Sequence, residues 1–72
     1  MKAKKMFEEL GYELERNNDC YLQFKRNDEM LIFAKEYKEY WVEDYRDGIA
    51  VSIRAQEHQA ITQQMKELGW IK

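Results

Sequence analysis

This chain of 72 residues has few of the residues that usually stabilise very small proteins. Its one cysteine, Cys20, excludes an internal disulfide. Its one histidine, His58, leaves too few Cys and His side chains for a structural zinc site. We therefore expect no disulfide, no metal and a fold that depends on packing or on self-association.

Proline, flexible linkers and long apolar runs are also missing. Without a linker rich in Gly and Ser, residues 1–72 are predicted to form a single small domain. Without a run of about 18 apolar residues, no membrane span is expected. The first residues, MKAKKMFEEL, include Glu8 and Glu9, which the apolar region of a signal peptide would not contain. We therefore expect a cytoplasmic protein that does not bind membranes.

No stretch of the sequence carries a concentrated excess of basic residues. The formal net charge is −2, and the basic residues are spread along the sequence. A nucleic-acid-binding protein usually carries a basic excess on one face, so nucleic acid is not a favoured partner. Aromatic residues make up 14% of the chain, which is typical of an ordered globular protein rather than a disordered one.

Apolar residues recur at helical spacing near both ends of the chain. Residues 2–10 and 55–68 place them three or four positions apart, which predicts an amphipathic helix in each range. The two stripes are Ala3, Met6, Phe7 and Leu10, and Ala55, His58, Ile61, Met65 and Leu68. The start of the second helix is weakly marked, because Arg54 is a poor N-cap and Ser52 is an alternative.

Between these helices the apolar pattern changes to the period of a strand. The predicted strands are YELER (12–16), CYLQFKR (20–26), MLIFAK (30–35), EYWVEDY (39–45) and IAVSI (49–53). MLIFAK is apolar on both faces, as in a strand that is covered on both sides. Asp47-Gly48 predicts a type I′ hairpin turn, which needs positive φ at both central residues.

The polar turns between these segments are short, which requires antiparallel pairing. The predicted fold is therefore α+β, with an N-terminal helix, an antiparallel meander of four to five strands and a C-terminal helix. Two amphipathic helices beside one sheet most simply cover the same face, so we expect both helices on one face of the sheet.

A phrase is repeated near the two ends of the chain, as KMFEELGY at 5–12 and QMKELGW at 64–70. Gly11 and Gly69 are predicted to lie just after the last helical residue, where a left-handed backbone favours glycine. The aromatic residue that follows can fold back on the last helical turn. The sequence thus indicates two helix stops rather than a duplicated functional motif.

Residues that usually carry catalysis are equally sparse. Ser52 is the only serine and Thr62 the only threonine, and no Gly-x-Ser-x-Gly motif or phosphate-binding glycine loop occurs. Cys20 lies in an alternating strand pattern that is typical of a small buried side chain. His58 lies on the apolar stripe of the last helix, so a catalytic Cys20–His58 pair is not favoured. We predict no catalytic residues, no cofactor and no enzymatic activity.

Residues 37–47, YKEYWVEDYRD, combine aromatic side chains with an excess of acidic ones. If they form a strand, alternate residues point to opposite faces, and the face away from the helices carries apolar and aromatic side chains. Such a patch is typical of an interface, although the sheet could instead curl so that the rings cover each other. The candidate interface residues are Tyr37, Tyr40, Trp41, Glu43 and Tyr45.

Four segments resemble small prophage-encoded proteins of Gram-positive bacteria, of the SPBc2 prophage type. These segments are KKMFEELGYE (4–13), YLQFKR (21–26), DYRDG (44–48) and QAITQQMKELGW (59–70). Members of that family begin with a helix that ends in Leu-Gly-Tyr and finish with one that ends in Leu-Gly-Trp. Arg54 departs from the family pattern, which has Thr or Ser there. The resemblance spans most of the chain, rests on helix stops and core positions, and implies an accessory phage or prophage protein without a transferable activity.

The sequence therefore favours a non-enzymatic accessory protein that acts through protein–protein contacts. A homodimer is the favoured assembly, because two-fold self-pairing is the commonest among soluble proteins. The alternative is that residues 37–47 bind a host or phage protein and block its nucleic-acid-binding groove.

Overall fold

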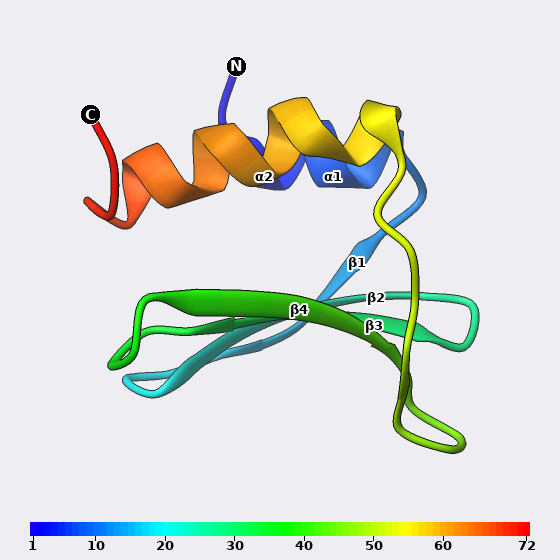
Figure 1. The fold of residues 1–72 in the computed structure, drawn as a ribbon. Helices are drawn as coiled ribbons and strands as arrows, with labels where there is room; N and C mark the ends of the chain where they lie inside the picture. Colours follow the sequence, from blue (N-terminus) through cyan, green and yellow to red (C-terminus); the bar gives the residue numbers. More distant parts are fainter.

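The computed structural model describes all residues 1–72 and has two layers (Figure 1). Helices α1 (Ala3–Glu9) and α2 (Ala55–Glu67) lie side by side over one face of a five-stranded antiparallel sheet. The strands follow chain order across the sheet: β1 (Glu13–Asn17), β2 (Tyr21–Arg26), β3 (Glu29–Ala34), β4 (Glu39–Asp44) and β5 (Ile49–Ala50). The predicted α+β meander with flanking helices is confirmed. Neither helix has the length and apolar character needed to cross a membrane.

Both helices end in the same backbone arrangement. Gly11 and Gly69 have φ of 92° and 77° and lie one residue beyond the C-caps. The backbone N–H of Tyr12 donates to the carbonyl of Phe7 at 2.9 Å, and that of Trp70 donates to Met65 at 2.9 Å. This pattern, the Schellman motif, satisfies carbonyl groups that the helix end would otherwise leave free. The repeated phrase therefore occupies equivalent positions in the two helices.

The beginning of α1 is stabilised from the other helix. Its N-cap residue, Lys2, makes no side-chain capping bond. Instead the N–H of Ala3 donates to a carboxylate oxygen of Glu67, at the end of α2, over 2.7 Å. A negative charge at a helix N-terminus is favourable because of the helix dipole. This contact ties the start of the chain to the last turn of α2.

The buried stripe of α2 differs from the prediction. The helix begins at Ala55 with Arg54 as an N-cap that makes no side-chain bond, so Ser52 is not the cap. Its buried side chains are Glu57, Ala60, Ile61 and Gln64, whereas His58 and Ala55 are exposed. The predicted apolar stripe is therefore wrong at Ala55 and His58, because the buried Glu57 bonds to an arginine of the sheet and His58 consequently points outward.

The core lies between the helices and the inner face of the sheet. Alternate residues of β2, β3 and β4 point inward, and the register places them in cross-strand rows. Phe7 of α1 is fully buried, and its ring lies 4.5 Å from that of Phe24 and 6.3 Å from that of Phe33. The buried core cluster comprises Ala3, Phe7, Tyr12, Leu22, Phe24, Leu31, Phe33, Val42, Ala60 and Ile61.

The prediction for Cys20, in the first hairpin, needs correction. Cys20 is exposed and lies in the bend before β2, so it is not a buried strand residue. The side-chain oxygen of Asn18 accepts hydrogen bonds from the backbone N–H groups of Cys20 and Tyr21, and this local turn replaces strand structure there. In β1 the register shifts between Leu14 and Arg16, and Leu14 is 40% exposed.

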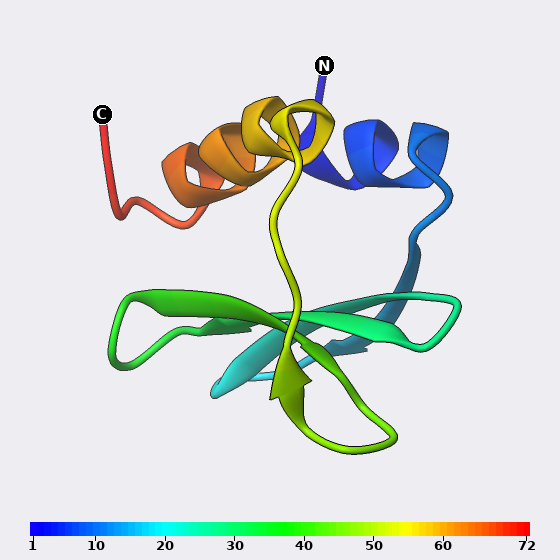
Figure 2. The ribbon, with the colours of Figure 1, turned by 45° about the vertical axis from the view of Figure 1, so that its right-hand side comes forward.

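The last hairpin also differs from the prediction. Asp44 pairs with Ile49 across a loop of four residues, 45–48, in which Gly48 has φ of 74° and Asp47 does not have positive φ. The prediction of a type I′ turn at Asp47-Gly48 is therefore wrong. Strand β5 has two residues, not five: the backbone N–H of Val51 still donates to the carbonyl of Val42, and the chain then leaves the sheet and rises to α2 (Figure 2).

The loop between β3 and β4 has the same length and ends in the same left-handed conformation. Lys38, with φ of 55°, holds the position that Gly48 holds in the last hairpin. A residue with a Cβ is strained in this region by roughly 1 kcal/mol, and glycine is not.

Lys38→Gly is expected to raise the free energy of unfolding by about 0.5 kcal/mol, since relief of strain exceeds the added entropy of the unfolded chain. Urea unfolding monitored by circular dichroism measures the change. Gly48→Ala, the reciprocal variant, should lower stability by about 1 kcal/mol. An unchanged or lower stability of Lys38→Gly would show that the turn is not strained.

Candidate interaction surface

The face of the sheet opposite the helices, called the outer face below, is covered by no other element of the chain (Figures 1 and 2). The strand register assigns nine residues of the three central strands to it. They form three rows across the sheet: Lys25–Met30–Glu43, Gln23–Ile32–Trp41 and Tyr21–Ala34–Glu39. β3 is therefore the middle strand of an exposed, partly apolar surface.

The centre of the outer face is apolar. Ile32 is 5% exposed although no helix covers it, and Ala34 is 4% exposed. Directly opposite neighbours on adjacent strands pack against each other, so Trp41 and Gln23 flank Ile32. Trp41 itself is 37% exposed. The side chains of β3 are therefore buried on both faces, as predicted, but on the outer face the side chains of β2 and β4 cover them.

The candidate interface residues predicted from the sequence are divided by the fold. Trp41 and Glu43 lie on the outer face, and the ring of Tyr45 joins them because it lies 4.8 Å from the Lys25 ammonium. Tyr40 points to the other side, where its ring lies 5.8 Å from that of Phe33. Tyr40 is therefore part of the core, not of the outer face.

Tyr37 and Tyr21 meet at one end of this surface. Tyr21 is not among the candidate interface residues named from the sequence. Tyr37 is 69% exposed in the β3–β4 loop. Together with Cys20, Ala34 and Glu36, these two rings line a shallow hollow of about 130 Å³. Tyr21 could have been found from the sequence, since it alternates with Leu22 and so must point away from the core.

Charged groups surround the apolar centre. Lys25 and Arg16 lie on the side of β2 and β1, and Glu39 and Glu43 lie on β4. None of these four side chains makes an ion pair within the chain. The Trp41 indole N–H donates to a carboxylate oxygen of Glu43 at 3.3 Å, which links two neighbouring outer-face residues of β4.

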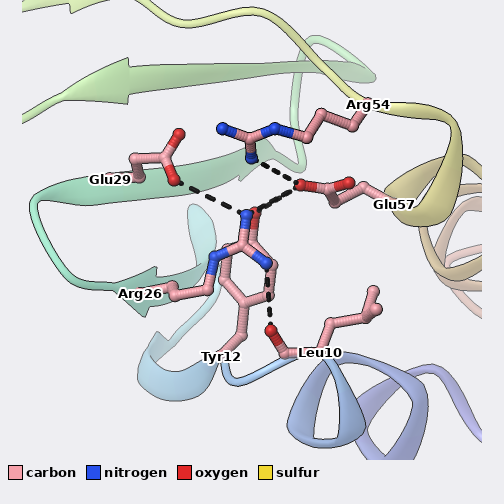
Figure 3. A network of polar contacts seen from close by, with 6 residues as sticks. All are labelled: Leu10, Tyr12, Arg26, Glu29, Arg54 and Glu57. Atoms are coloured by element: carbon pink, nitrogen blue, oxygen red, sulfur yellow. Dashed lines mark hydrogen bonds and ion pairs between the residues drawn. The ribbon is translucent and has the colours of Figure 1, made fainter.

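On the inner side, a polar network joins the two layers (Figure 3). Arg26, at the end of β2, donates to a carboxylate oxygen of Glu57 at 2.8 Å and to the carbonyl of Leu10 at 3.0 Å. Its guanidinium also lies 4.3 Å from the centre of the Tyr12 ring and 3.5 Å from Glu29. Arg26 thus connects the end of α1, the sheet and the first turn of α2.

Glu57 is the least exposed charged member of this network, at 3%. One carboxylate oxygen, Oε1, accepts from Arg26, from Arg54 at 3.4 Å and from the Tyr12 hydroxyl at 3.4 Å. The other oxygen is buried without a hydrogen-bond partner. Sequence reasoning missed this network, because nothing in the period of α2 distinguishes Glu57 from a surface carboxylate until its partner on β2 is known.

The network changes the acidity of Tyr12. Burial raises the pKa of the Tyr12 hydroxyl from 10.0 to about 12, with Glu57 adding to the rise and Arg26 opposing it. The folded protein therefore keeps this proton to higher pH than the unfolded chain. The contribution of the Tyr12 hydroxyl to the free energy of unfolding is fully present below pH 10 and is lost as the pH rises toward 12.

A tyrosinate absorbance titration is expected to show a late step near pH 12 that belongs to Tyr12. Tyr12→Phe should remove that step and leave the remaining tyrosine absorbance change in place. The free energy of unfolding should fall between pH 10 and 12 in the parent chain more steeply than in Tyr12→Phe. An identical titration curve for both proteins would contradict the assignment.

No arrangement for catalysis is formed by the candidates considered from the sequence. Cys20 lines the hollow at the end of the outer face, whereas His58 lines a different, polar hollow on the helix layer. No group of three or more His, Cys, Asp or Glu side chains is placed to hold a metal ion.

Comparisons with family models, with curated proteins and with solved structures find no match to this chain. The outer face is therefore interpreted from its own geometry and chemistry.

Proposed function

We propose that this chain is a non-enzymatic accessory protein that acts through protein–protein contacts, and that the outer face is its working surface. The favoured occupant is a second copy of the chain, which makes the protein a homodimer. A phage or prophage origin is part of the same proposal and is based on the sequence resemblance alone.

The observation that carries the proposal is an uncovered sheet face with an apolar centre. Trp41 and Tyr21, which are 37% and 36% exposed, lie beside the buried side chains of Ile32 and Ala34, and charged side chains lie around them. Contiguous apolar patches with polar rims are typical of interaction sites. Tryptophan and tyrosine are frequent anchors of interfaces, since they bury a large area with few rotatable bonds.

The alternative, an acidic and aromatic segment 37–47 that occupies the groove of a host or phage protein, has less support. Its side chains do not form one surface, because Tyr40 packs in the core. Asp44 is engaged by Arg46, whose guanidinium lies 2.7 Å from it and also contacts Asp28. The acidic residues of this segment that lie on the outer face are Glu39 and Glu43. Both are as consistent with a homodimer interface as with binding to another protein.

Trp41→Ala tests the working surface. If self-association uses the outer face, this variant should raise the dissociation constant of the dimer about 30-fold, the effect of losing a hot-spot residue of about 2 kcal/mol. Sedimentation equilibrium measures the constant, and circular dichroism checks that the variant remains folded. His58→Ala, exposed on α2 at the opposite side of the molecule, is the control and should leave the constant unchanged.

Equal dissociation constants for Trp41→Ala and the parent chain would rule out the outer face as the dimer interface. A monomeric parent chain would instead leave the outer face free for another protein. In that case Trp41→Ala and a Glu43→Gln variant should both lose whatever specific protein the immobilised parent chain retains.

A further inference from the structure

The charges on the outer face are distributed unevenly across the sheet. The β2 side carries Lys25, with Arg16 and Glu13 beyond it on β1, whereas the β4 side carries Glu39 and Glu43. Lys25 and Glu43 lie in the same row, on either side of Met30. A surface with opposite charges on its two sides can be complementary to itself, but only in some orientations.

Two copies that stack their outer faces must be related by a two-fold axis that lies between the sheets. If the axis runs parallel to β3, β2 of each copy lies over β4 of the other, and β3 lies over β3. The rows then stay aligned, so each Lys25 faces the partner's Glu43 and each Trp41 faces the partner's Gln23. The Lys25–Glu43 ion pair therefore occurs twice by symmetry.

An axis perpendicular to the strands, through the row of Ile32, gives a different result. It places β2 over β2 and β4 over β4 and exchanges the outer rows. Glu43 of each copy then faces the partner's Glu39, and Lys25 faces the partner's Tyr21. Like charges placed opposite one another disfavour an interface, so this orientation is opposed by the same residues that favour the first.

We infer that the partner of the outer face is a second copy related by a two-fold axis parallel to β3, and that the Lys25–Glu43 contact between copies fixes this orientation. The inference rests on the proposed function, since it assumes that the outer face is the working surface. It goes further in naming the orientation and the residues that determine it.

The dimensions of the chain are compatible with this pairing. A standard interface buries roughly 800 Å² per partner, which is about one-sixth of the 4920 Å² that this chain exposes. Two sheets stack face to face at about 10 Å with their strands about 30° apart. The loop of the β4–β5 hairpin, residues 45–48, projects on the outer side in Figure 2 and begins beyond Asp44, at the end of the rows, where it would flank the partner sheet.

Charge exchange between Lys25 and Glu43 tests the orientation. Lys25→Glu places two glutamates opposite each other in both symmetric contacts, and Glu43→Lys places two lysines there. Each single variant is therefore expected to weaken the dimer at least 10-fold in sedimentation equilibrium at moderate salt. An equimolar mixture of the two variants should form a heterodimer, because both of its contacts are then between opposite charges. The double variant Lys25→Glu/Glu43→Lys should restore self-association to within about 3-fold of the parent chain.

The controls separate this inference from the proposed function. Lys25→Glu also loses the contact with the Tyr45 ring, so Lys25→Gln, which loses that contact without adding a negative charge, measures its share. Suppose that Trp41→Ala weakens the dimer, but that neither the mixture of Lys25→Glu with Glu43→Lys nor the double variant of both restores dimer formation. The outer face is then the interface, and the proposed orientation is wrong. If Glu43→Lys tightens the dimer, the perpendicular axis is correct, since the new lysine then faces the partner's Glu39. A parent chain that is monomeric at every concentration overturns this inference and the homodimer of the proposed function, and leaves the outer face as a surface for another protein.

Discussion

Arg26→Ala is expected to lower the free energy of unfolding by about 3 to 5 kcal/mol, because it leaves the buried carboxylate of Glu57 without its closest positive partner. Glu57 is 3% exposed and already has one oxygen without a hydrogen-bond partner, so it cannot recover hydration when Arg26 is removed. The carbonyl of Leu10, at the end of α1, loses a donor in the same variant.

This loss is large relative to the whole stability of the chain. A domain of 72 residues is expected to have a free energy of unfolding of about 4 to 11 kcal/mol. Arg26→Ala should therefore lose from about a quarter to all of the stability of the chain, which urea titration followed by far-ultraviolet circular dichroism measures directly.

Arg26→Met/Glu57→Leu is the matched double variant. It removes both charges and fills the space with apolar side chains, so it should recover most of the loss and fall within about 2 kcal/mol of the parent chain. The remaining difference reflects the Tyr12 hydroxyl, whose acceptor is removed. If Arg26→Ala costs less than about 1 kcal/mol, the network is not a buried cross-link between the layers, and α2 must be held by its apolar side chains alone.

Phe7→Ala is expected to cost about 3 to 5 kcal/mol, the usual range for removing a fully buried phenylalanine. The ring contacts Tyr12, Phe24 and Phe33, so it is the centre of the contact between α1 and the sheet. Helix α1 has seven residues, which is too short to be helical in isolation. Loss of this side chain should therefore release the whole helix and not only create a cavity.

Hydrogen exchange measured by NMR separates these two consequences. In Phe7→Ala the amides of α1 should exchange much faster than those of β3, whereas in the parent chain both should be protected. Glu8→Ala, on the exposed side of the same helix, is the control and should change stability by less than about 0.5 kcal/mol. Uniform acceleration of exchange throughout the Phe7→Ala variant would contradict a separate release of α1.

The fold could be predicted from the sequence because its elements have clear periods and short turns. The α1 stripe, the alternation of Leu22 and Phe24 and the glycines at the helix ends each depend on local spacing, and local spacing is what a sequence displays. The last hairpin was less well predicted, since Asp47-Gly48 is compatible with two loop lengths. Its length is set by the pairing of Asp44 with Ile49, which is not a local property.

The candidate site could be predicted in part. The strand pattern placed Trp41 and Glu43 on one face and Tyr40 on the other, but it could not say which face the helices cover. The inward turn of Glu57, and with it the exposure of His58, depends on Arg26, which is 31 residues away in the sequence. Contacts over such separations are determined by packing and do not appear in the pattern of either segment alone.

The most direct test of the account is the molar mass of the parent chain in solution, measured by light scattering over a range of concentrations at moderate salt. We expect the mass to rise from that of the 8.8 kDa chain to twice that value, as the outer faces of two copies cover each other. A mass that stays at 8.8 kDa at every concentration would contradict self-association and would leave the outer face without the partner assigned to it.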